Sequence, residues 1–163
     1  MTSPSDPAVR PATRDDLGVL GRLGTLLIEA HHRFDPQRFF ASAADTERTY
    51  ADFLGSQLTR PNTIILVIER GGRVLGYAYA GVEGTDYMAL RGPAGVLYDL
   101  VIDPDHRSDA LGSMLLQAAL DALAARGVPR TVLFAAHQNL AAQRLFARNG
   151  FRPTMVEMTR ETG

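Results

Sequence analysis

The sequence predicts a single α/β domain in which a mixed central sheet of about six to seven strands is flanked by about four helices. The chain has 163 residues, 45% of them hydrophobic and 21% charged, which is enough for one globular core. Helix-like and strand-like patterns alternate along it. A strand–helix–strand unit over residues 94–136 favours parallel pairing, whereas the earlier strands favour antiparallel pairing. The domain is expected over residues 9–163, after a disordered leader at 1–8.

The first elements are a short strand and a long helix. VRPA at 9–12 is a candidate edge strand. Thr13 and Asp16 then form the pattern of a capping box, and leucines recur at helical spacing up to about His31. The aromatic segment HHRFDPQRFF at 31–40 contains a proline that interrupts the helical pattern. It is expected to be an irregular connection.

The middle of the chain predicts a second helix and an antiparallel hairpin. The helix is expected over about 45–58, before a proline stop. TIILVIERGGRVLGYAYAGV at 63–82 supplies two strands around Gly71 and Gly72, a dipeptide suited to a tight turn. Residues 83–93 are polar or small, as expected of a loop.

The remaining part predicts three strands separated by two helices. AGVLYDLVI at 94–102 is a strand, and apolar residues at helical intervals follow over 111–123. TVLFAA at 131–136 is the next strand, and a helix capped by an asparagine is expected over 139–148. TMVEMTR at 154–160 alternates as a final strand.

Composition excludes several classes of function. A formal net charge of -1 gives no electrostatic reason to expect nucleic acid or an anionic membrane as a partner. The chain has no cysteine, which excludes disulfides, thiolate zinc sites and a cysteine nucleophile. No window approaches the length of an apolar membrane span, and no signal-peptide pattern is present. The sequence therefore predicts a cytoplasmic protein.

The stretch DPDHRSDALGSMLL at 103–116 is a candidate anion site. The first N–H groups of a helix have no partner within the helix, and the helix dipole attracts negative charge there. Ser108, Ala110 and Gly112 are small enough to let a phosphate approach the backbone, and Arg107 can add a cation. A plain loop remains the alternative. The P-loop pattern GxxxxGK[ST] is absent, and no GxGxxG follows a strand.

DLVIDPDHRSDALGSMLL and NLAAQRLFARNGF resemble the two central motifs of the GCN5-related N-acetyltransferase (GNAT) family. In that family an Arg/Gln-x-x-Gly-x-Gly/Ala loop binds the pyrophosphate of acyl coenzyme A. The matching residues here are Arg107, Ala110 and Gly112, so that alanine replaces the first motif glycine. The resemblance implies a GNAT-like fold with acetyl-CoA as cosubstrate and no metal.

The resemblance also implies a cofactor-binding set. Backbone N–H groups of residues 108–112 would hold the pyrophosphate, and the strand edge near Val101 would pair with pantetheine and polarise the thioester carbonyl. Asn139 would face the pantetheine arm or its thiol, and it can also cap a helix. Phe146 stands where many relatives carry the tyrosine that protonates the leaving thiolate. The implied residues are Leu100, Val101, Arg107, Ser108, Asp109, Ala110, Leu111, Gly112, Ser113, Asn139 and Phe146.

Two carboxylates are candidate catalytic groups. Asp99 lies in the apolar run VLYDLVI, where a carboxylate is costly unless it is used or paired. Its position matches the one where many GNAT relatives place a glutamate base, so catalysis or substrate binding is favoured over a structural ion pair. Glu83 is a second candidate facing the acceptor, although a solvated loop charge is the favoured interpretation.

Other polar side chains favour structural roles. Adjacent His31 and His32 lack the spacing of a helical metal pair and are interpreted as surface or loop-packing residues, and His137 as a capping residue. The tyrosines in and near the strands are interpreted as sheet packing, with Tyr98 facing opposite to Asp99. They are Tyr77, Tyr79, Tyr87 and Tyr98.

These patterns predict an N-acetyltransferase in which a primary amine attacks acetyl-CoA directly in a ternary complex. The partners are then an acyl-CoA and an amine acceptor, either a small molecule or a protein amine, and a homodimer is one candidate assembly. A non-catalytic acyl-CoA binding or regulatory module is the alternative, motivated by Phe146 and Ala110.

Overall fold

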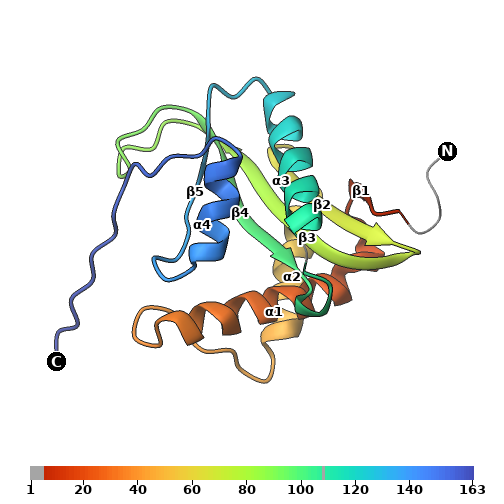
Figure 1. The fold of residues 1–163 in the computed structure, drawn as a ribbon, viewed down its shortest axis with the longest axis horizontal. Helices are drawn as coiled ribbons and strands as arrows, with labels where there is room; N and C mark the ends of the chain where they lie inside the picture. The colour runs from red at the N-terminus through yellow and green to blue at the C-terminus, as the bar shows by residue number, and fades with distance from the viewer. Residues whose placement is uncertain (1–5, 108) are drawn as a thin grey trace.

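A mixed sheet with the spatial order β1-β2-β3-β4-β5 is the centre of the fold (Figure 1). The computed structural model describes residues 6–107 and 109–163. Within them the strands are β1 (Ala8–Pro11), β2 (Thr63–Arg70), β3 (Arg73–Glu83), β4 (Ala94–Ile102) and β5 (Thr131–Leu133). The helices are α1 (Leu17–Phe34), α2 (Thr46–Gln57), α3 (Asp109–Ala124) and α4 (Leu140–Arg148), with short 3-10 turns at Arg14–Asp16 and Pro104–His106.

The predicted α/β class and mixed sheet are confirmed, with five strands in the described residues. Strands β1 to β4 pair antiparallel in chain order, and β4 pairs parallel with β5. The parallel ladder is short, since only residues 95–97 of β4 face residues of β5. Beyond Leu97 the chain after β5 leaves the sheet, and β4 continues alone on that side.

The prediction of a final strand over 154–160 is wrong. Residues 152–163 are exposed and carry no strand assignment, and Figure 1 shows them running away from the sheet. An alternating pattern decides which face a side chain takes, but a strand also needs a neighbour for its backbone hydrogen bonds. In the described part of the chain no strand runs beside this segment. The strand predicted over 131–136 likewise ends at Leu133.

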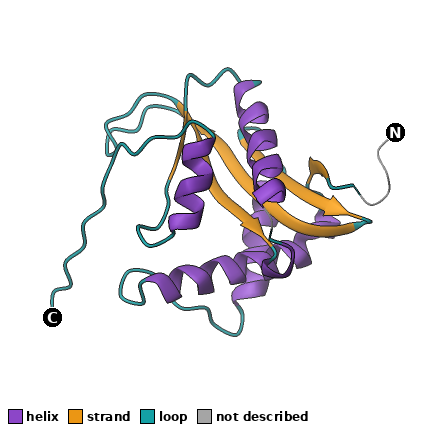
Figure 2. Cartoon of the chain, viewed as in Figure 1, coloured by secondary structure: helices purple, strands orange, loops and turns teal. Residues whose placement is uncertain are grey.

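Helices cover both faces of the sheet (Figure 2). On one face, α3 presents a stripe that includes Leu115, Leu116 and Leu123, all fully buried against residues of β2, β3 and β4. On the other face, Leu20 and Leu23 of α1 pack with Tyr77 of β3 in a second cluster. The amphipathic patterns of the sequence therefore become two cores separated by one sheet.

The predicted capping box before α1 is confirmed. The Thr13 backbone N–H donates to Asp16 Oδ2 over 2.7 Å. Arg10 of β1 also donates to both oxygens of the same carboxylate, at 2.8 and 3.0 Å. The start of the helix is thus attached to the edge strand.

Helices α1 and α2 approach closely because α1 carries two glycines on the facing side. A Cβ added at Gly21 would lie 2.3 Å from the carbonyl oxygen of Glu47, and one added at Gly24 would lie 2.2 Å from the Tyr50 ring. Neither position has room for a larger residue. This close contact fixes where Tyr50 lies relative to the sheet.

None of the helices in the residues described combines the length and the apolar character required to cross a bilayer.

Candidate active site

A β-bulge in β4 sets the orientation of the side chains around Asp99. Tyr79 of β3 pairs with Asp99, whereas the next residue, Ala80, pairs with Leu97, so Tyr98 is an extra residue in β4. A bulge interrupts the alternation of side chains along a strand. The Tyr98 ring lies 4.7 Å from the Tyr79 ring, on the face that Asp99 also takes. The expectation that Tyr98 faces opposite to Asp99 is therefore wrong.

Two tyrosine hydroxyls bind the Asp99 carboxylate. Tyr50 of α2 and Tyr77 of β3 both donate to Asp99 Oδ2, the latter over 2.9 Å. Tyr77 is completely buried, and Tyr50 is partly buried against α1. The interpretation of Tyr77 as sheet packing thus missed a polar role. Tyr87, by contrast, is 83% exposed in the β3–β4 connection, so its interpretation as sheet packing is wrong.

Burial dominates the electrostatics of Asp99. It raises the pKa of the carboxyl above its ordinary value, while the hydrogen bonds from Tyr50 and Tyr77 and the nearby His31 act in the opposite direction. Burial and the Asp99 charge also raise the pKa of both phenols. The two tyrosines therefore stay protonated at neutral pH and remain hydrogen-bond donors.

Glu83 has a different environment at the end of β3. Its carboxylate pairs with Arg91 over 2.6 Å and accepts a hydrogen bond from Tyr98 over 2.6 Å. The Tyr98 hydrogen bond, followed by Arg91, holds the pKa of Glu83 below its ordinary value. Glu83 is thus a paired surface carboxylate and a weaker base than Asp99.

The residues that follow Asp99 lie on a free strand edge. Leu100 and Val101 pair with β3 on one side, but among the residues described no strand pairs with them on the other. Leu100 packs with the α3 core, whereas Val101 is 6% exposed in the core of the opposite face. Their backbone edge is available to an extended ligand.

An ion pair between a buried carboxylate and an arginine of α1 anchors the start of the 103–112 segment. Asp103 is 2% exposed, and it accepts from Arg22 of α1 over 3.0 Å and from the Asp105 backbone N–H over 3.0 Å. Burial alone would raise the pKa of Asp103, but the Asp105 N–H and Arg22 outweigh it, so that the pKa is lowered. The segment therefore leaves β4 in a fixed direction. Arg107 follows as an exposed cation.

The predicted anion loop leads directly into α3, which begins at Asp109. Ala110 belongs to the helix and has no positive φ, so the alanine in place of the motif glycine carries no backbone strain. Leu111 is buried in the core, and Ser113 is partly buried. A Cβ at Gly112 would lie 3.4 Å from Leu145 of α4, an ordinary van der Waals contact, so packing alone does not require a glycine here. Ser108 lies outside the described residues, and only the backbone of Asp109 is described.

The last two residues of the predicted set lie at the cap of α4 and within this helix. The Asn139 side chain accepts from the Ala142 backbone N–H over 3.2 Å, which confirms its role as a cap. Phe146 is partly buried, packs on the α3 core and contacts the Phe151 ring at 5.9 Å. The roles of both residues toward a cofactor stay predictions.

His31 and His32 pack as the sequence suggests. The Nδ1 atom of His31 lies 2.8 Å from the Leu27 carbonyl oxygen, and its ring contacts Phe39 at 5.0 Å. The Nδ1 atom of His32 lies 2.7 Å from the Phe39 carbonyl oxygen. His137 is exposed. Within the described residues, no cluster of three or more acidic or histidine side chains could hold a metal ion.

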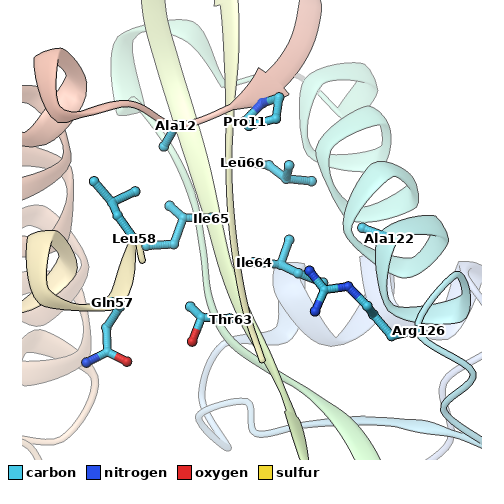
Figure 3. Close-up of a pocket in the computed structure, with 10 residues that line it drawn as sticks. All are labelled: Pro11, Ala12, Gln57, Leu58, Thr63, Ile64, Ile65, Leu66, Ala122 and Arg126. Carbon is cyan, nitrogen blue, oxygen red and sulfur yellow. The ribbon is translucent and has the colours of Figure 1, made fainter. Parts of the chain in front are cut away.

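Two shallow cavities lie near the sheet. One, of about 280 Å³, lies where β1 ends beside β2, and none of the predicted site residues lines it (Figure 3). The other, of about 300 Å³, is lined partly by Tyr79, Tyr98 and Gln57. Because Tyr79 pairs with Asp99, the second cavity adjoins the candidate active site.

Residues 26–151 match the model described as the acetyltransferase (GNAT) family. The chain belongs to this family. It is 34% identical over 125 residues to a mycothiol acetyltransferase of Clavibacter michiganensis subsp. michiganensis, a match that covers 74% of this chain and 38% of that protein. The GNAT chain thus spans well under half the length of this relative.

Solved structures show the same fold. A mutant of the BH1408 protein from Bacillus halodurans superposes with a TM-score of 0.84 at 18% identity, over 95% of this chain and 99% of that one. A predicted acetyltransferase of Clostridium acetobutylicum, determined with acetyl-CoA, superposes with a TM-score of 0.73 at 13% identity, over 94% and 96% of the two chains. At these identities the likeness concerns the fold alone.

Proposed function

We propose that this GNAT chain transfers an acetyl group from acetyl-CoA to a primary amine, by direct attack in a ternary complex. One observation carries the proposal: Asp99, a carboxylate held by two phenols, lies next to the free strand edge at Leu100 and Val101. A proton acceptor and a backbone able to bind an acyl donor thus occur at one place. The name of the Clavibacter relative and the acetyl-CoA of the Clostridium structure support the choice of cosubstrate.

The residues of this chain fit coenzyme A. The free edge of β4 offers backbone groups for an extended pantetheine arm, and the N-terminus of α3 offers N–H groups for a pyrophosphate. Arg107 is exposed beside this helix end and can add charge-assisted hydrogen bonds. When bound, acetyl-CoA supplies an activated thioester whose thiolate is a good leaving group, since a thiol has a pKa of about 8.5.

Asp99 would move the proton. A free aliphatic amine has a pKa near that of lysine, about 10.4, so it is protonated at neutral pH and must lose a proton before its lone pair can attack. Asp99 takes this first proton directly or through a water. The neutral nitrogen then forms the amide bond as the carbon–sulfur bond breaks, and its second proton passes to solvent. The raised pKa of this carboxyl makes it a stronger base than an ordinary aspartate.

Because residue 146 is a phenylalanine, no tyrosine stands at the usual family position to protonate the leaving thiolate. Because the thiolate is stable near neutral pH, it can depart and take its proton from solvent. Glu83 is proposed to have a secondary role near the acceptor, because Arg91 already neutralises it.

Release of the CoA thiol tests the proposal. The chain has no cysteine, so a thiol reagent reports only CoA when the protein is supplied with acetyl-CoA and a panel of primary amines. We expect release that depends on the amine, with the acetylated amine identified by its mass. Tight binding of CoA with no turnover on any amine would instead support a non-catalytic acyl-CoA binding module.

A further inference from the structure

We propose that Tyr50 and Tyr77 are positioning residues, which hold Asp99 by its Oδ2 atom and leave Oδ1 to receive the acceptor amine. This inference rests on the proposed function, because it takes Asp99 as the group that accepts the amine proton. Neither tyrosine belongs to the motifs found in the sequence. They come from different elements, α2 and β3, and meet only in the folded protein.

The hydrogen bonds of Asp99 are asymmetric. Both phenols donate to Oδ2, and in the part of the chain that the structure describes no group donates to Oδ1. Oδ1 is also absent from the fully buried polar atoms that lack a partner, so it keeps access to solvent. A carboxylate with one oxygen saturated and the other accessible can accept a proton in one defined direction.

Packing fixes both phenols. Tyr77 is fully buried in the cluster formed by the sheet with α1 and α2. The Tyr50 ring occupies the space that a side chain at Gly24 of α1 would need, and it also contacts Phe53 at 6.2 Å. Three elements therefore determine where the two hydroxyls lie. A group whose rotamer is locked in this way can hold a catalytic carboxylate in a productive geometry.

The two hydrogen bonds also set how readily Asp99 ionises. Three groups act on the pKa of Asp99: Tyr50 from α2, Tyr77 from β3 and His31 from α1. Tyr79 of β3 faces Asp99 as well, but there burial and then the carboxylate raise the pKa of the phenol. The Tyr79 hydroxyl donates to Gln57 Oε1 over 3.4 Å and not to Asp99. Hydrogen bonds to the ionised form favour that form. Loss of either phenol hydroxyl should therefore make Asp99 harder to ionise.

The test compares Tyr50→Phe and Tyr77→Phe with the matched control Tyr79→Phe. Each change removes one hydroxyl and keeps the ring. Titration of the Asp99 carboxyl carbon by NMR, in the protein without substrates, reports its ionisation directly. We expect the midpoint to move to higher pH in Tyr50→Phe and Tyr77→Phe and to stay in place in Tyr79→Phe.

Kinetics supply the second readout. In Tyr50→Phe we expect kcat at neutral pH to fall by roughly tenfold, the scale of one hydrogen bond to a charged group, and to recover at high pH. KM for acetyl-CoA should not change, because α2 lies outside the cofactor-binding set. Because Tyr50 is only partly buried, Tyr50→Phe is expected to fold even if Tyr77→Phe does not.

The outcomes separate the two proposals. A midpoint that does not move in Tyr50→Phe overturns the positioning role. If the midpoint moves but the protein transfers no acetyl group to any amine, the contact of Tyr50 with Asp99 stands. Asp99 then has no catalytic role, and the proposed function is wrong. A loss of kcat that is the same at every pH would indicate a merely structural role and also overturns the proposal.

Discussion

The two candidate carboxylates differ in the charge of their partners. Glu83 pairs with a guanidinium, whereas the hydrogen-bond donors of Asp99 are uncharged phenols. At Glu83 the hydrogen bond from Tyr98 and the charge of Arg91 together outweigh the effect of burial, so the pKa of the carboxyl is lowered and its basicity falls. At Asp99 the phenols orient a partly buried carboxylate while its pKa stays raised. Asp99, which has no arginine among its hydrogen-bond partners in the described residues, is therefore the better proton acceptor.

We expect Glu83→Gln to affect stability more than catalysis. The Glu83–Arg91 pair is partly exposed, so its loss should lower the free energy of unfolding at pH 7 by about 1 kcal/mol or less. Because the folded-state pKa of Glu83 is lowered, this contribution is present above the ordinary glutamate pKa and is lost as pH falls through the folded value.

Urea unfolding at neutral and acid pH checks this prediction. The variant and the natural protein should differ at pH 7 and converge at acid pH, while turnover of the variant stays within a few-fold of the natural protein. A loss of turnover as large as that of an Asp99 variant would contradict the assignment of Glu83 to a secondary role.

Arg107 should contribute to cofactor affinity. Its exposed guanidinium lies beside the start of α3, and a hydrogen bond to a charged group is worth roughly 1.5 to 3 kcal/mol. We expect Arg107→Ala to weaken CoA binding by about 10- to 150-fold in calorimetry. Arg73→Ala, which removes an exposed arginine at the start of β3, is the control with the same change of charge. Equal affinities of the two variants would show that Arg107 does not bind the pyrophosphate.

At the scale of elements, the contact between α1 and α2 connects the fold to the site. Gly21 and Gly24 lie one turn apart and let α2 approach α1. Tyr50 reaches Asp99 from α2, so the spacing of these helices decides whether the hydroxyl and the carboxylate meet.

We expect Gly21→Ala to lower the free energy of unfolding by roughly 1–3 kcal/mol, the usual cost of overpacking. The added Cβ would meet a backbone oxygen at 2.3 Å, which cannot move aside as a side chain can. Gly18→Ala on the same helix is the matched control, because outside its chain neighbours and its own helix backbone no atom lies within 4 Å of its added Cβ. That change should stabilise the protein by about 0.5–1 kcal/mol through helix propensity alone. Denaturant melts in which both variants shift in the same direction would contradict this packing.

The helices and most of the sheet could be predicted because each has a local signal. The capping box at Thr13 and Asp16 and the cap at Asn139 are examples, and both form as expected. The strand predicted at 154–160 failed because local alternation contains no information about a pairing partner.

The candidate site could be predicted only in part. Asp99 was recognised because a carboxylate in an apolar run is unusual. Its contacts with Tyr50 and Tyr77 join residues 49 and 22 positions away, and no short-range pattern encodes them. The bulge at Tyr98 also escaped prediction, since one extra residue in a strand has no distinct sequence pattern. Gly24 could have indicated that a large side chain packs on α1, because a glycine in a helix leaves room for a close neighbour.

At the scale of the whole molecule, cofactor binding should stabilise the fold. A ligand that binds only the folded protein at 100 times its dissociation constant adds about 2.7 kcal/mol. For a chain of this size the melting temperature should then rise by roughly 5–10 °C. Differential scanning fluorimetry with CoA and acetyl-CoA measures the shift. An unchanged melting temperature at millimolar CoA would contradict cofactor binding by this GNAT chain.

The pH dependence of acetyl transfer by Asp99→Asn tests the central claim, that Asp99 accepts the amine proton, most directly. The variant keeps the shape of the side chain but cannot accept that proton. We expect it to bind CoA normally and to lose roughly 100-fold or more in turnover at neutral pH. The loss should shrink at high pH, where solvent supplies the neutral amine. Turnover within a few-fold of the natural protein at neutral pH, with an amine that the protein acetylates well, would contradict the claim.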